Sequence, residues 1–283
     1  MPGIYIAATL TSLLAMAGFG TLIYKLPRPA NGWLLLTAVL VCVPLQPLAF
    51  YVVRMPLDQW LAGWLTRQSF AYQGLTTLYA PLTEEPAKLL VLLIPAIFRD
   101  IRPENFARYA LAIGLGFAVG EMWFVAERLS RQPALAGLPF GQFGGYVTER
   151  LMTCVFHSAF VSISLSRLRK RLWLGLCLAM AAHWAANFPI SLMAWNVGGL
   201  GRTTWEVIVG LWLLSLFIGA TVLLIRYTSS RLSFLRLLYG LRHCPECGTQ
   251  FEPSMLAINM GDKRYEKCPR CRKWLWTRGC TLK

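Results

Sequence analysis

Long apolar runs constrain this chain more than any other feature of its sequence. Hydrophobic residues make up 56% of the 283 positions, and charged residues only 14%. A helix needs about 20 mostly apolar residues to cross the hydrocarbon core of a bilayer, and several runs are long enough. A soluble domain of this composition would expose more apolar surface than water tolerates. The sequence therefore predicts an all-α, multi-pass protein of the cell membrane.

Seven segments are predicted to span the lipid bilayer as a helical bundle. The first run lacks the basic start and the small-residue cleavage site of a signal peptide, so we expect it to remain as the first helix. The stretch Leu57–Gln73 is apolar but interrupted by charges, and we expect an interfacial helix there rather than an eighth span. The predicted spans are Ile4–Tyr24, Trp33–Val53, Leu75–Phe98, Phe106–Ala126, Tyr146–Ser166, Leu172–Trp195 and Thr204–Ile225.

Lysine and arginine are unevenly divided between the two sets of loops. One set carries 13 basic residues and the other carries 6. Because basic loops stay in the cytoplasm, seven spans place the N-terminus outside and the C-terminus in the cytoplasm. The same distribution accounts for the net charge of +15, so nucleic acid is not an expected partner. The poorer set consists of Arg54, Arg67, Arg128, Arg131, Arg150 and Arg202.

Several polar side chains lie well inside the predicted spans. A charge at the centre of a bilayer costs at least about 2.5 kcal/mol, so such residues face the bundle interior and are functional candidates. At about 1.5 Å per residue, they fall in one layer between the midplane and the outer leaflet. A lone histidine or a Glu–Lys pair is commonly structural, but polar groups from four helices at one depth favour a site. The candidates are Glu84, Glu85, Lys88, Glu121, His157, His183 and Asn187.

Two features indicate irregular or close helix packing near these residues. Pro189 has no N–H group and leaves the carbonyl of Ala185 without its helical donor, which is tolerated at membrane depth where the backbone is buried in protein or lines a cavity. Gly116 and Gly120 form a GxxxG pair, which allows another helix to approach closely.

Hydrolysis is the chemistry that this cluster fits best. Glu84 or Glu85 would activate a water molecule as general base, and Lys88 shares a helix face with both and would hold their charge. A neutral histidine or the amide of Asn187 could donate to the oxyanion that forms.

A metal-dependent route is equally compatible with the residues. His157, His183 and Glu121 could hold a divalent metal whose bound water attacks the substrate. The chain has no HExxH or GxSxG pattern of the common metallo- and serine hydrolases. A non-catalytic transporter or receptor with a polar solute site, or a scaffold, are the alternatives, although no inverted repeat typical of transporters is found.

Four short motifs follow one another on four successive predicted spans. They are Glu84-Glu85-Pro-Ala-Lys88, Phe117-Ala-Val-Gly-Glu121, His157-Ser-Ala-Phe160 and His183-Trp-Ala-Ala-Asn187. Together they resemble the PrsW family, which is related to the CAAX prenyl endopeptidase and bacteriocin-processing group of membrane proteases. The resemblance covers spans three to six. It implies intramembrane cleavage of a membrane-associated protein substrate, such as an anti-sigma factor, under a metalloprotease label that could also cover a metal-free glutamate mechanism.

The C-terminal tail carries two CxxC pairs. Cys244 and Cys247 form the first pair, and 20 intervening residues separate it from Cys268 and Cys271. This spacing predicts a four-cysteine zinc ribbon, and disulfides are rare in the cytoplasm, where the tail is expected. A closed shell of four thiolates is typical of a structural zinc, not a catalytic one.

The chain is therefore expected to contain a transmembrane protease-like domain at residues 1–228, a basic linker at 229–242 and the zinc ribbon at 243–283. Besides the lipid bilayer and the substrate, anionic lipid, protein or nucleic acid are conceivable partners for the basic, tryptophan-containing ribbon. A folding staple, or a module that docks a cytoplasmic protein partner, is the favoured interpretation.

Overall fold

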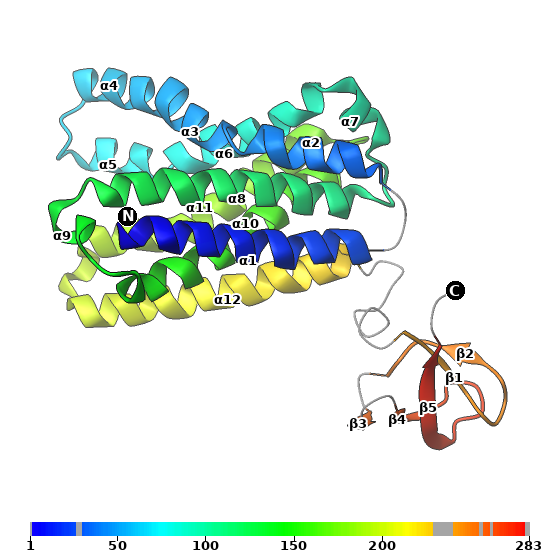
Figure 1. Ribbon diagram of the computed structural model, residues 1–283. Coiled ribbons are helices and arrows are strands. Elements are labelled where there is room, and N and C mark those ends of the chain that lie inside the picture. Colours follow the sequence, from blue (N-terminus) through cyan, green and yellow to red (C-terminus); the bar gives the residue numbers. More distant parts are fainter. Residues whose placement is uncertain (1, 27–29, 229–239, 255–256, 261–262, 281–283) are drawn as a thin grey trace. The chain divides into compact units, whose positions relative to one another are not determined.

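The computed structural model describes residues 2–26, 30–228, 240–254, 257–260 and 263–280. The chain divides into two compact units, Met1–Leu224 and Ile225–Lys283. The first is helical, and the second contains a small β-sheet with a cluster of cysteines (Figure 1). A mostly helical chain with a separate cysteine-rich tail is thus confirmed.

The long helices of the first unit lie side by side (Figure 1). They are α1 (Gly3–Lys25), the run from α2 (Gly32–Cys42) to α4 (Met55–Trp64), α8 (Phe106–Ser130), α10 (Gly144–Leu165), α11 (Leu172–Ala194) and α12 (Arg202–Thr228). The shorter elements are α3 (Leu45–Leu48), the π-helix η1 (Ala49–Arg54), α5 (Phe70–Thr76), α6 (Tyr79–Leu89), η2 (Leu90–Leu93), α7 (Pro95–Asp100), α9 (Pro133–Ala136), η3 (Phe140–Phe143) and η4 (Val197–Gly199).

Five of these helical runs are long and apolar enough to cross a membrane. The predicted third and fifth spans are not among them. The third is broken into short pieces, and α10, although 22 residues long, carries too many polar residues. The five runs are Gly3–Lys25, Gly32–Trp64, Phe106–Ser130, Leu172–Ala194 and Arg202–Thr228.

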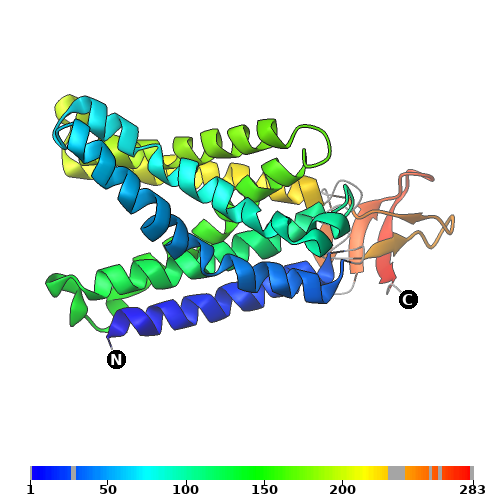
Figure 2. The same ribbon diagram turned by 90° about the horizontal axis from the view of Figure 1, so that it is seen from above.

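The predicted boundaries are wrong in the second and third spans. The second run continues past Val53 to Trp64 through the π-helical turn η1, because such a turn absorbs local irregularity without ending the helix. Figure 2 shows this run crossing the bundle obliquely. In the third span, helix α6 ends at Leu89, and Ile94 is extended before Pro95 opens α7, since the residue before a proline avoids helical geometry. The expected interfacial segment is likewise divided between α4 and α5.

Helix α8 is the centre of the first unit and packs against α1, α2 and α10. Its two GxxxG glycines lie directly against α2. A Cβ atom added to Gly116 would come within 2.2 Å of the carbonyl oxygen of Val39, and one added to Gly120 within 2.0 Å of that of Val43. The expected close helix approach is present, and α2 is the helix that makes it.

Helix α12 packs more loosely than α8. Its buried residues are Trp205, Val209, Ala220 and Leu224. One specific contact joins it to α11: the indole N–H of Trp212 donates to the carbonyl oxygen of Ala185 at 3.0 Å. This is the carbonyl that Pro189 leaves without a helical donor, so a side chain from the neighbouring helix fills the position.

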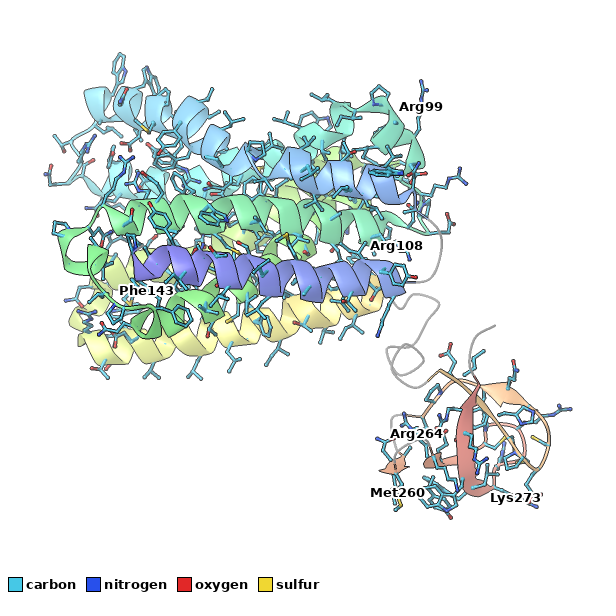
Figure 3. The ribbon with its side chains drawn as sticks, viewed as in Figure 1. Arg99, Arg108, Phe143, Met260, Arg264 and Lys273 are labelled. Carbon is cyan, nitrogen blue, oxygen red and sulfur yellow. The ribbon has the colours of Figure 1, made fainter. Side chains whose placement is uncertain are left out.

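At one end of the first unit, arginine side chains donate hydrogen bonds to backbone carbonyl groups. The Arg108 guanidinium donates to the carbonyl oxygens of Tyr24 and Leu26, and that of Arg169 donates to the carbonyl of Phe98. Arg99 and Arg108 lie at this end of the bundle and Phe143 lies toward the opposite end (Figure 3). The arginines thereby satisfy carbonyl groups that helix ends leave unpaired.

In its described residues, the second unit contains five short antiparallel strands in the order β2-β1-β5-β4-β3. Phe251, Cys244 and Cys268 form its small core. The first strand begins inside the segment assigned to the linker, whose residues 229–239 lie outside the described part of the chain. The strands are β1 (Leu241–His243), β2 (Gln250–Phe251), β3 (Ile258–Met260), β4 (Lys263–Lys267) and β5 (Trp274–Cys280).

Candidate functional site

A cavity of about 690 Å³ in the helical unit is lined by residues from several helices. All four helices that carry the predicted polar residues contribute to its wall. Of the seven candidates, five line the cavity, and Glu85 and Lys88 do not. The five are Glu84 of α6, Glu121 of α8, His157 of α10, and His183 and Asn187 of α11.

Glu85 lies behind the cavity wall and is paired twice. Its Oε1 atom accepts from the Lys88 ammonium at 2.5 Å and contacts Nδ1 of His183 at 2.6 Å. Glu85 and Lys88 are 1% and 0% exposed, and the Lys88 ammonium also lies 4.9 Å from the ring centroid of Phe117. A buried charge requires a partner of this kind, so these two residues form a closed pair that holds His183.

Glu84, the sequence neighbour of Glu85, has a different partner from the one expected. Its Oε1 accepts from the Arg54 guanidinium at 2.6 Å, and no contact joins it to Lys88 within the described residues. The expectation that Lys88 holds both carboxylates is wrong, because Arg54 at the end of η1 supplies the cation for Glu84. The second oxygen, Oε2, lies 3.9 Å from Nε2 of His183.

A second cluster of charges forms around Glu121. Its Oε1 lies 2.9 Å from the Arg150 guanidinium, and its Oε2 lies 2.7 Å from Nε2 of His157. The other ring nitrogen of His157, Nδ1, is buried and has no hydrogen-bond partner in the described part of the chain. Such buried orphans are rare in folded proteins, so this nitrogen is a candidate contact for a bound water or ligand.

Aromatic packing joins the two clusters. The rings of His157 and His183 are 6.2 Å apart between centroids and nearly perpendicular. Phe160 stacks on His183 at 5.3 Å, and Phe117 meets His157 edge-on at 5.1 Å. Two Glu–His pairs therefore share one site on a fixed aromatic support.

The set expected for a catalytic metal does not come together as a ligand group. Among the described residues, only the four cysteines of the tail place three or more ligand atoms within reach of one ion. Glu121 and His157 form a hydrogen bond with each other, whereas His183 forms one with Glu85. The carboxylates moreover face arginine or lysine, which supply the positive charge that a metal would otherwise bring.

Arg54 and Arg150 were missed as site residues, because both were counted as loop charges that set the orientation. Arg150 precedes His157 by seven residues, which is two helical turns and the same face of α10. That spacing could have placed it in the site. Arg54 carries no comparable signal, since it contacts Glu84 only through the arrangement of η1 against α6.

The four cysteines of the second unit are placed to hold a metal ion. Their Sγ atoms all lie within 4.8 Å of one another, and the pairs Cys244–Cys271 and Cys247–Cys268 are 3.7 Å apart. A tetrahedral zinc with Zn–S bonds of about 2.3 Å separates its sulfur atoms by roughly 3.8 Å. The residues therefore fit zinc.

Each CxxC pair lies in a tight turn with the same hydrogen bonds. Gly248 donates its N–H to the carbonyl of Cys244, and Arg272 donates to that of Cys268. Both turn residues have positive φ, 68° and 60°. Hydrogen bonding to Thr249 lowers the pKa of Cys247 to about 6, which favours the thiolate, the form that binds metal.

Fold and site together define a mostly helical protein with helices able to cross a membrane, a cavity with ionisable side chains on its wall, and a β unit whose four cysteines are placed to hold a metal ion. Comparison of the chain with protein-family models, with curated proteins and with solved structures gives no match.

Proposed function

We propose that the helical unit is a membrane-embedded endopeptidase that hydrolyses a peptide bond of a membrane-associated protein. The observation that carries this proposal is the cavity whose wall carries His157 and His183, each held by a glutamate: His157 by Glu121 on the wall and His183 by Glu85 behind it. It is large enough for an extended peptide segment together with a water molecule. The motif resemblance to the PrsW family supports the same class.

The attacking water is best placed between Glu84 and His183. Glu85 accepts from Nδ1–H of His183, so the neutral ring presents Nε2 as an acceptor. Glu84 Oε2 is a second acceptor 3.9 Å from that nitrogen, a gap too long for a direct hydrogen bond and suited to one bridging water. Such a water donates both protons to these acceptors and directs its lone pairs into the cavity.

The reaction follows from this arrangement. The water oxygen attacks the peptide carbonyl carbon while Glu84 takes one water proton as general base. The proton then passes to the leaving nitrogen as the C–N bond breaks, which leaves a carboxylic acid and an amine. Lys88 and Glu85 do not touch the substrate and serve to position His183.

The opposite wall is suited to binding the substrate and the charge that develops on it. Nδ1 of His157 would accept a backbone N–H of the substrate, since Glu121 fixes the proton on Nε2. Arg150 and Asn187 line the cavity and could donate to the oxyanion, a contribution that typically amounts to 10²–10³-fold in rate per donor.

The orientation of the chain is part of the proposal. Arg54 and Arg150 are ion-paired in the site and do not act as loop charges, so the poorer loop set keeps Arg67, Arg128, Arg131 and Arg202. The difference in basic residues between the two sets of loops becomes larger, which strengthens the case for a cytoplasmic C-terminus. A reporter fused after Lys283 should read as cytoplasmic and one inserted near Gly198 as external; the reverse result would contradict the orientation.

The proposal is tested by comparing new protein termini in membranes of cells that express different variants. Glu84→Gln keeps the size of the side chain but removes the base, so wild-type termini should fall 10²–10⁴-fold in abundance. Glu127→Gln is the matched control, because it makes the same change on α8 outside the cavity. Termini that persist with Glu84→Gln would contradict the proposal.

A second candidate function is a non-catalytic receptor or transporter for an anionic solute. The observation in its favour is that Arg54 and Arg150 both line the cavity. Each is already paired with a glutamate, so an anion would have to displace a carboxylate, which favours the hydrolase. Unchanged termini together with solute binding by the purified chain would favour this candidate.

A further inference from the structure

The sheet of the second unit carries an exposed face made of apolar and aromatic side chains. Ile258 pairs with Tyr265 and Tyr265 with Trp276, and Met260 pairs with Lys263. Directly paired residues project from the same face of a sheet. Ile258 and Met260 are 62% and 64% exposed, and Trp276 is 45% exposed, so this face is open to its surroundings.

The opposite face of the sheet is buried and carries a polar network beside Phe251 and Leu275. Nε of Arg242 lies 3.2 Å from Glu266 Oε1 and donates to the Thr277 hydroxyl oxygen at 3.0 Å. Arg264 is buried on the same side, with 2% of its surface exposed. A sheet with one solvated face normally carries polar side chains on that face, not aromatic and aliphatic ones. An exposed apolar patch of this kind marks a surface that another structure covers.

The rings on the exposed face form one continuous patch, bordered by positive charge. The ring centroid of Tyr265 is 5.7 Å from that of Trp274 and 5.2 Å from that of Trp276. No acidic residue projects from this face of the described strands. We call it the aromatic face; it consists of Ile258, Met260, Tyr265, Trp274 and Trp276 with the exposed basic residues Lys263, Lys267 and Arg278.

We propose that the aromatic face docks on the surface of an anionic lipid bilayer. Tryptophan and tyrosine rings favour the membrane–water interface, and lysine and arginine are drawn to anionic headgroups. Ile258 and Met260 insert at the boundary of the acyl chains, as apolar side chains of interfacial segments do. A single nucleic-acid strand would use the rings by stacking but gives these two aliphatic side chains no role.

The covalent connection to α12 keeps a membrane within reach. Thirteen residue steps separate Thr228, the last residue of α12, from Leu241, the first of β1, and a fully extended chain of that length spans about 45 Å. Helix α12 is one of the runs able to cross a membrane. A tethered module meets its partner at high effective concentration, so a small docking face is sufficient.

The test uses the full chain reconstituted in vesicles, with the recognition sequence of a specific protease inserted between residues 229 and 239. After cleavage, flotation separates vesicle-bound from released C-terminal unit. The unit should float with vesicles that contain phosphatidylglycerol and leave them at high salt, because salt screens the attraction. It should remain in solution with phosphatidylcholine alone. Release from both kinds of vesicle would overturn the proposal.

Variants locate the docking surface. Lys263→Ala with Lys267→Ala should weaken binding roughly fivefold for each charge removed, and Trp274→Ser with Trp276→Ser should abolish flotation. A zinc content equal to that of the unaltered chain verifies that the C-terminal unit of each variant is folded.

The matched control removes two charges from the second CxxC turn, in Arg270→Ala with Lys273→Ala. Met260 and Lys273 lie on opposite sides of the unit (Figure 3), so binding should be nearly unchanged. An equal loss in this control, or preferential binding of a labelled oligothymidylate over the vesicles, would show that the aromatic face is not a lipid surface.

Discussion

Glu84 and Glu85 are neighbours in the sequence, yet their different partners give them different tasks. Glu84 borders the cavity and pairs with Arg54, whereas Glu85 is enclosed with Lys88 and holds His183. Adjacent residues on a helix point about 100° apart, so only one of the two can face the cavity directly. The sequence motif marks the pair as important but does not distinguish Glu84, the proposed base, from Glu85, the proposed positioning residue.

Removing Glu85 and Lys88 together tests the positioning role. Glu85→Gln alone would leave a buried, unpaired ammonium, which is strongly destabilising, so Lys88→Met is added to remove it. The double variant should fold, as judged by thermal unfolding in detergent. Hydrolysis should still fall by about 10²-fold or more, because an amide can donate as well as accept and no longer fixes the proton of His183 on Nδ1 as the acceptor-only carboxylate does. Full activity in a folded double variant would contradict this role.

At the scale of elements, the site depends on how closely α8 lies against α2. Gly116 and Gly120 leave room for the carbonyl groups of that helix, and α8 in turn presents Glu121 to α10. The GxxxG pattern identified this contact from the sequence, since the requirement is for small residues at a fixed spacing.

Gly120→Ala should destabilise the helical unit. The added methyl group would meet the Val43 carbonyl oxygen, and overpacking of this kind typically costs 1–3 kcal/mol. Gly18→Ala on α1 is the control, because nothing lies within 4 Å of its Cβ position. Thermal unfolding should show a lower midpoint for Gly120→Ala alone, and equal midpoints would argue against the close packing of α8 on α2.

The elements also show where sequence reasoning reaches its limit. Apolar runs predict the five long helical runs because length and composition alone decide whether a helix can cross a bilayer. The prediction from apolar runs is wrong at the third predicted span, because Pro95 and the extended Ile94 interrupt the helix there. The same prediction ends the second span too early at η1, because nothing in the local sequence indicates that the helical run continues past Val53.

The candidate site was also predicted only in part: its polar residues were identified from the sequence, and their partners were not. Intramembrane charge is costly, which is why Glu121 and His157 could be selected without a structure. Their pairing and the two arginines could not, because these depend on contacts between elements distant in sequence. Arg54 is the clearest case: it joins Glu84 across 30 residues of chain.

The whole molecule combines a charge-neutralised site with a cluster of four cysteines placed to hold a metal ion, which predicts a metal content. The purified full chain should carry one zinc, and Cys244→Ser with Cys247→Ser should carry none, because two thiolates cannot complete the tetrahedral shell. Elemental analysis measures both. Retention of a stoichiometric divalent metal in the cysteine variant would place a metal in the helical unit and contradict the carboxylate mechanism.

The most direct test of the central claim uses the purified chain with a substrate identified from its new termini, reconstituted together in vesicles prepared in water enriched in oxygen-18. Cleavage should occur at one peptide bond and place oxygen-18 in the new carboxyl terminus. Glu84→Gln should abolish cleavage, and Glu127→Gln should leave it intact. Cleavage by the Glu84→Gln variant at the wild-type rate would show that the helical unit does not use Glu84 as a base.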